Sequence, residues 1–96
     1  MTNLKANVIR EFINAYAWSV MYDKILYQDE IDISNQDREY YTEKYYQHLH
    51  VMNAMQRVLS VTDNKKLIPE ARESAVKHGQ ELFEHWMTNN RKEKTA

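Results

Sequence analysis

The chain has 96 residues, of which 43% are hydrophobic and 28% charged, and its net charge is −1. That length allows one folded domain and excludes two, and the balanced charge supplies neither the basic surface of a typical nucleic-acid binder nor the acidic surface of a DNA mimic. One Gly and one Pro are too few turn residues for the many chain reversals of a β-sandwich, so an all-α fold is favoured. Because the chain contains no Cys, disulfides and thiolate metal sites are excluded.

The first predicted helix covers residues 3–28, which contain neither Gly nor Pro and begin with a plausible N-cap at Asn3. Its main apolar stripe consists of Leu4, Val8, Phe12, Tyr16 and Val20. A second stripe, Trp18, Met21 and Ile25, lies on nearly the opposite side. Together with Tyr22, this second stripe is either a docking surface for a partner or a core face covered by the loop at 29–34 or by the third helix.

The second predicted helix covers residues 35–61, because Ser34 and Asp37 have the spacing of a capping box. At roughly 100° per residue, the predicted inward stripe is Tyr41, Tyr45, His48, Met52, Met55 and Leu59. On the same scale Tyr46 lies at about 240° from Tyr40, away from that stripe, beside His50, Asn53 and Arg57. Tyr and Arg are enriched in interface hot spots, so this face is a candidate partner-binding surface; the alternative is a solvated face with one stray aromatic residue.

The third predicted helix covers residues 69–89, with Pro69 at its first position and acidic residues in its first turn. Its inward stripe is Ala75, Gly79, Leu82, Phe83 and Trp86. The small residues Ala75 and Gly79 either allow a neighbouring helix to approach closely, or Gly79 is simply tolerated at a cost of ~1 kcal/mol. Three helices with short connections predict an antiparallel three-helix bundle over residues 1–90, followed by a flexible polar tail at 91–96.

No constellation of catalytic residues is evident, which predicts a protein that is not an enzyme. Four His residues are present, and Glu81 and His85 have the spacing of a metal-binding pair, but a structural zinc site needs four ligands; we expect neither metal nor cofactor. A Ser nucleophile would need a Gly-rich elbow, which is missing. The N-terminal residues lack the apolar region of a signal peptide and no run approaches ~18 apolar residues, so we expect a cytoplasmic protein without membrane contact.

A small helical transcription regulator that binds DNA, as a dimer, is the alternative class. A helix-turn-helix usually has Gly in its turn, whereas the one Gly here is in mid-helix. Acidic residues among Arg72 and Lys77 also oppose contact with phosphates. Direct nucleic-acid binding is therefore not expected, and a homodimer is possible.

The length, the all-α character, the lack of Cys and the lone Pro69 in KKLIPEARE make the chain similar to the anti-RecBCD recombination proteins encoded by lambdoid Salmonella phages. The resemblance implies that the protein binds the host RecBCD helicase-nuclease through its RecC subunit, in the bacterial cytosol. It would then modify the Chi-regulated nuclease and recombination activity so that linear phage DNA survives. The resemblance also implies that a host peptidyl-prolyl isomerase engages Ile68 and Pro69, and it supplies no catalytic residues.

Overall fold

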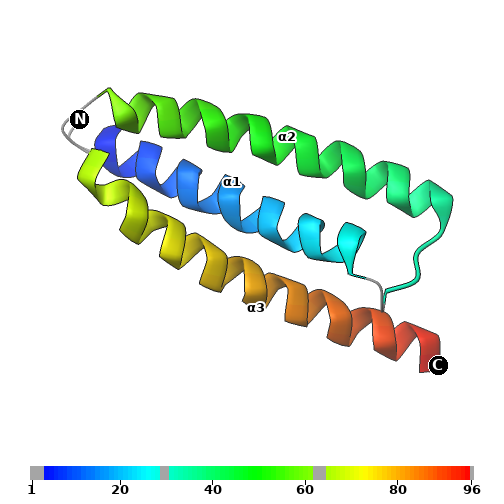
Figure 1. Ribbon diagram of the computed structural model, residues 1–96. Helices are drawn as coiled ribbons and strands as arrows, with labels where there is room; N and C mark the ends of the chain where they lie inside the picture. The colour runs from blue at the N-terminus through cyan, green and yellow to red at the C-terminus, as the bar shows by residue number, and fades with distance from the viewer. Residues whose placement is uncertain (1–3, 29–30, 62–64, 96) are drawn as a thin grey trace.

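The computed structural model describes residues 4–28, 31–61 and 65–95, with side chains described for 7–28, 31–61 and 65–89. These residues form the helices α1 (Leu4–Tyr27), α2 (Asn35–Ser60) and α3 (Ile68–Thr95), a 3₁₀ turn at Lys65–Leu67, and no strand. Figure 1 shows α1 between the other two helices, with α2 running opposite to both. The predicted all-α three-helix fold is confirmed.

The helix ends agree with the predicted ones except at the end of α3. Ser34 is the N-cap of α2, and its hydroxyl oxygen accepts a hydrogen bond of 3.1 Å from the backbone N–H of Asp37. The proposed cap at Asn3 lies outside the described residues. α3 begins one residue before Pro69 and continues to Thr95, past the predicted end at 89. The flexibility expected of residues 91–96 stays a prediction, since their side chains lie outside the described part.

α1 is buried on two sides because it is the central helix. Near its N-terminal half, the Phe12 cluster joins Phe12, Leu59 of α2 and Ala71 of α3, and half-buried residues such as Tyr16, Met52 and Met55 pack around it. Near its C-terminal half, the Ile25 cluster joins Met21, Tyr22 and Ile25 to Phe83 of α3. Phe12, Ile25 and Leu59 are the largest fully buried side chains, each worth about 1.5–3 kcal/mol of apolar transfer.

The loop between α1 and α2 closes the Ile25 cluster. Ile31 and Ile33 pack against it, and the guanidinium of Arg38 donates a hydrogen bond of 3.0 Å to the backbone carbonyl of Leu26. That bond ties the first turn of α2 to the last turn of α1. The loop is therefore part of the core at this end of the bundle.

α3 approaches α1 closely at Gly79. A Cβ atom built there would lie 2.7 Å from the carbonyl oxygen of Ala17 and 2.7 Å from Cβ of Val20, which is shorter than carbon atoms tolerate. Ala75, one turn earlier on the same face, is completely buried. The small residues of α3 thus allow the close approach that their spacing suggested.

We expect Gly79→Ala to lower the free energy of unfolding. Alanine favours a helix over glycine by ~1 kcal/mol, but overpacking a tight contact costs about 1–3 kcal/mol, and here the obstacles are a backbone carbonyl and a branched Cβ that cannot rotate away. Denaturant unfolding measures the difference. The control is Ser74→Ala on the exposed side of the same helix, which should stabilise slightly; an equal gain at both positions would show that α3 has room at Gly79.

Candidate protein-binding surface

The second stripe of α1 is core, not a docking surface. Met21, Tyr22 and Ile25 are only 5%, 8% and 1% exposed, and Trp18 is half-buried. Leu82, Phe83, Trp86 and Met87 of α3 and the two isoleucines of the loop cover these side chains. Of the two alternatives that the sequence left open, the docking surface is wrong and the core face is right, because both α3 and the loop at 31–34 fold over this stripe.

An aromatic stack accounts for the half-buried Trp18. The imidazole of His48, from α2, lies 5.9 Å from the Trp18 ring and 5.7 Å from the Tyr22 ring, nearly parallel to both. Burial, and then the positive charge of Lys44, lowers the pKa of His48 below its ordinary value. At the same end of the bundle, the indole N–H of Trp86 donates a hydrogen bond of 3.1 Å to the hydroxyl of Tyr41. These contacts join the three helices at the end of the bundle near Trp86, away from the close contact at Gly79.

The outward face of α2 lies where the helical rotation predicted it. Tyr46 is 49% exposed, and His50, Asn53 and Arg57 are exposed beside it. The ring of Tyr46 meets the ring of Tyr45 edge to face, with centroids 5.2 Å apart. Their role in binding a partner stays a prediction, but their exposure makes them available for it.

Beside Tyr46, the side chain of Tyr45 lines a groove to which all three helices contribute. The groove has a volume of about 410 Å³. Its floor is α1, one wall is α2 and the other is Val76 of α3; the lining residues are Tyr16, Ser19, Val20, Asp23, Lys24, Tyr45, Leu49, Met52 and Val76. Most of these side chains are half-buried, and Val76 is 46% exposed. We call these residues, with Tyr46 at their edge, the three-helix groove.

Polar groups lie at both ends of the three-helix groove. One turn beyond Met52 and Val76, the guanidinium of Arg72 donates a hydrogen bond of 2.9 Å to the side-chain oxygen of Gln56, which bridges α3 and α2. At the other end are Asp23 and Lys24. Burial raises the pKa of the Tyr45 hydroxyl, and the nearby carboxylate of Asp23 raises it further. An apolar centre with polar ends is the usual composition of a protein-binding surface.

Sequence reasoning missed the three-helix groove. Helical rotation assigned Tyr45 to the inward stripe of the second helix and did not connect Tyr45 or Leu49 with Val76 of the third. Their combination depends on the distance between α2 and α3, which no single-helix pattern contains. The one available signal was Leu49, an apolar residue at the edge of that stripe.

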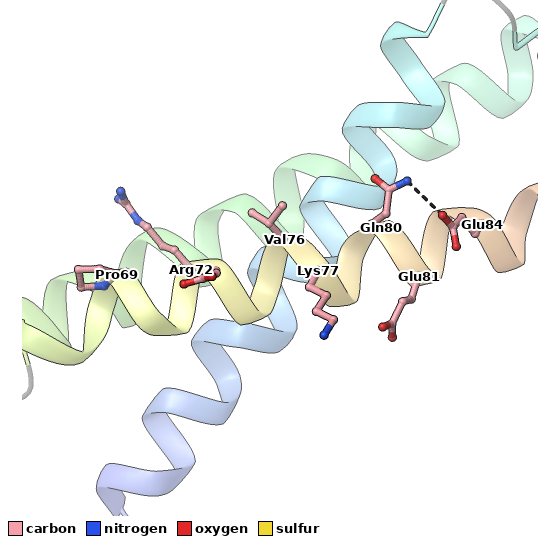
Figure 2. Close-up of a pocket in the computed structure, with 8 residues that line it drawn as sticks. Pro69, Arg72, Val76, Lys77, Gln80, Glu81 and Glu84 are labelled. Carbon is pink, nitrogen blue, oxygen red and sulfur yellow. Dashed lines mark hydrogen bonds between the residues drawn. The ribbon is translucent and has the colours of Figure 1, made fainter.

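Pro69 lies at one end of the outer face of α3 (Figure 2), and its side chain is exposed while that of Ile68 is half-buried. The Ile68–Pro69 peptide bond is trans. Along the same face, Arg72 and Lys77 alternate with Glu73, Glu81 and Glu84. The amide of Gln80 donates a hydrogen bond of 3.3 Å to Glu84. This face therefore carries mixed charge around the exposed apolar side chains of Pro69 and Val76.

The histidines do not converge on a metal site in the part of the chain that the structure describes, where no three His, Asp or Glu side chains gather. Glu81 pairs with His78, 4.0 Å away, and not with His85. His85 instead lies 3.1 Å from the side-chain nitrogen of Asn89. Both pairs are exposed and lie within one helix.

No protein-family model, curated protein or solved structure matches the sequence. Among the described residues, none of the helices combines the length and the apolar character needed to cross a lipid bilayer.

Met21→Asp should destabilise the fold strongly. The substitution would bury a carboxylate without a partner in the Ile25 cluster, and such a change typically costs several kcal/mol or forces the group to stay protonated. Thermal melting followed by circular dichroism measures the loss. A melting temperature within about 2 °C of the parent, on the scale where 1 kcal/mol shifts a domain of this size by about 4–8 °C, would contradict the burial of Met21.

His48 should make the fold less stable in mild acid. Its pKa is lowered in the folded chain and stays near ~6.5 in the unfolded chain, so the unfolded state binds the proton more readily. The stability is complete above pH ~6.5 and is lost as the pH falls from there toward the folded pKa. His48→Phe keeps an aromatic ring and should flatten the dependence of melting temperature on pH between about 5 and 7.5.

The matched control for that experiment is His85→Phe, because His85 is exposed at the end of the same bundle. It should retain the parent's dependence on pH. If His48→Phe also retains all of it, the acid sensitivity arises elsewhere.

Proposed function

We propose that this chain is a non-catalytic protein-binding module of the host bacterial cytosol. Its target is the RecBCD helicase-nuclease, bound through RecC, as the resemblance of the sequence implies. Binding would alter the Chi-regulated nuclease and recombination activity of RecBCD and so protect linear phage DNA.

The three-helix groove is the observation that carries this proposal. It is open and shallow, with apolar side chains in the middle, polar groups at each end and an exposed tyrosine at its edge. Enclosed pockets of similar volume suit small ligands, whereas an open apolar groove between helices suits an amphipathic helix of another protein. From Tyr16 to Lys24 the floor extends over about 12 Å, which accommodates about two turns of such a helix.

A protein target accounts for this surface better than DNA does. Contact with phosphates needs clustered Lys and Arg, but the cations of the outer face of α3 alternate with carboxylates (Figure 2). The groove itself contains one Lys and one Asp among mainly apolar residues. The alternative of a DNA-binding regulator therefore receives less support than docking on a protein.

The second partner implied by the resemblance is a host peptidyl-prolyl isomerase. Such an enzyme would engage Ile68 and Pro69 at the start of α3, where the proline ring is exposed. That position lies outside the three-helix groove, so the isomerase and RecC would use separate surfaces.

The test of the groove is Leu49→Asp, measured on purified RecBCD degrading linear duplex DNA. The parent protein should change the rate of degradation and form a complex with RecBCD on a sizing column. Leu49 lies in the wall of the groove, so a charge there should raise the concentration needed by about tenfold or more, since losing a hot spot costs ~2 kcal/mol.

Ser74→Asp is the matched control, because Ser74 is exposed on α3 away from the groove. It should act like the parent, and both variants should keep the parent's helicity. Unchanged degradation and no complex at saturating parent protein would refute RecBCD as the target. Equal loss in both variants would refute the groove as the site.

A further inference from the structure

A second exposed apolar surface lies on α2, on the flank opposite the three-helix groove. Tyr40, Val51 and Val58 are 53%, 40% and 42% exposed, and they are three of the large hydrophobic residues that the described structure leaves in solvent. They belong to a series that recurs in alternating steps of four and three residues: Tyr40, Lys44, Gln47, Val51, Ala54 and Val58. We call this series the α2 seam.

The spacing of the α2 seam is that of a coiled-coil helix. Alternating steps of three and four keep side chains on one line along a helix that pairs with another helix. Lys44 is half-buried, and the other five side chains are exposed. The ammonium of Lys44 lies over the Tyr40 ring, 5.6 Å from its centroid, so these two members of the seam contact each other.

The seam is accessible without any change in the fold. By helical rotation it is centred near the direction of Tyr40, whereas the core side of α2 lies at about 100° and Leu49 in the groove wall at about 180°. Figure 1 shows α2 at the edge of the bundle, with α1 on its inner side. A partner helix on the seam would therefore leave both the core and the three-helix groove in place.

The charges beside the seam indicate what pairs with it. Glu43, His50 and Arg57 follow one another at seven-residue intervals on the side of the seam away from the core, and all three are exposed. Within the described residues, neither Glu43 nor Arg57 forms an ion pair in the monomer. The row is acidic at one end and basic at the other, so it is complementary to itself when the helix is reversed.

We propose that the α2 seam binds the same seam of a second copy of this chain, with the two α2 helices antiparallel. In this register Tyr40 faces Val58 of the second copy, Lys44 faces Ala54, and Gln47 faces Val51. Each of these contacts occurs twice, as the two-fold symmetry of a homodimer requires. Glu43 then lies beside Arg57 of the second copy at both ends of the interface.

A parallel pair is much less favourable. It would place Lys44 directly against Lys44 of the second copy and Glu43 away from Arg57. Like charges facing each other destabilise such a pair, while opposite charges at flanking positions select orientation. The polar residues Lys44 and Gln47 within the seam weaken the dimer and also restrict its register.

The test is a charge exchange measured by analytical ultracentrifugation over a range of concentrations. The parent should be a reversible dimer. Glu43→Arg alone or Arg57→Glu alone should weaken dimerisation about tenfold or more, and the double variant should restore it, because the complementary pairs are then re-formed in reverse. Both positions are exposed, so circular dichroism should show unchanged helicity in all three variants.

Orientation can be tested directly, since the chain contains no Cys. A single cysteine in His50→Cys lies near its counterpart at the centre of the antiparallel pair and should react with a short thiol crosslinker. Gln36→Cys, near the start of α2, should not react, because reversal places the two copies far apart. A parent that stays monomeric at all concentrations, a dimer insensitive to both charge reversals, or crosslinking at 36 and not at 50 would each overturn the proposal.

Discussion

The contact between α1 and α3 at Gly79 sets the geometry of the rest of the bundle. The missing side chain lets the backbone of α3 come so near to Ala17 and Val20 that even a methyl group would collide. Around this point the spacing of the helices is controlled by small residues, with Ala71 and Ala75 buried on the same face of α3. Beyond it, toward the end of α3, large side chains take over: Phe83 and Trp86 stack on each other, and Trp86 reaches Tyr41 of α2. Small side chains therefore lie between α1 and α3 near Gly79, and large aromatic side chains fill the core toward the end of α3.

The large side chains at this end of the bundle explain how a short chain buries both apolar stripes of α1. Trp18 and Tyr22 are covered by the imidazole of His48, and Met21 and Ile25 are covered by α3 and by the isoleucines of the loop. A histidine in this stack contributes a flat ring, and the same burial disfavours its protonation. The Ile25 cluster is thus flanked by an imidazole whose neutral form the folded chain favours.

α2 presents two separate surfaces because it contacts α1 on one side and meets α3 at few places. One flank forms a wall of the three-helix groove through Tyr45, Leu49 and Met52, and the other carries the α2 seam. The two flanks are about half a helical turn apart, so occupation of one leaves the other free. A dimer joined along the seam would carry two grooves and could engage a large target at two points. His50 and Arg57 lie between the two surfaces, which makes them sensitive to both kinds of contact.

The amino-acid sequence by itself determined the helices, the Ser34 cap and the outward direction of Tyr46, because these depend on local periodicity and on hydrogen bonds between neighbours in the chain. It did not determine the end of α3, since the charged residues after 89 are helix formers with no apolar pattern to mark a boundary. Periodicity also placed Trp18, Met21 and Ile25 on one side of α1 but left open what covers that side. Only the tertiary structure decided that they are core and that Leu49 and Val76 share a groove. Burial and grooves depend on how far apart the helices lie, and that distance is set by contacts such as Gly79 against Ala17, between residues far apart in the chain.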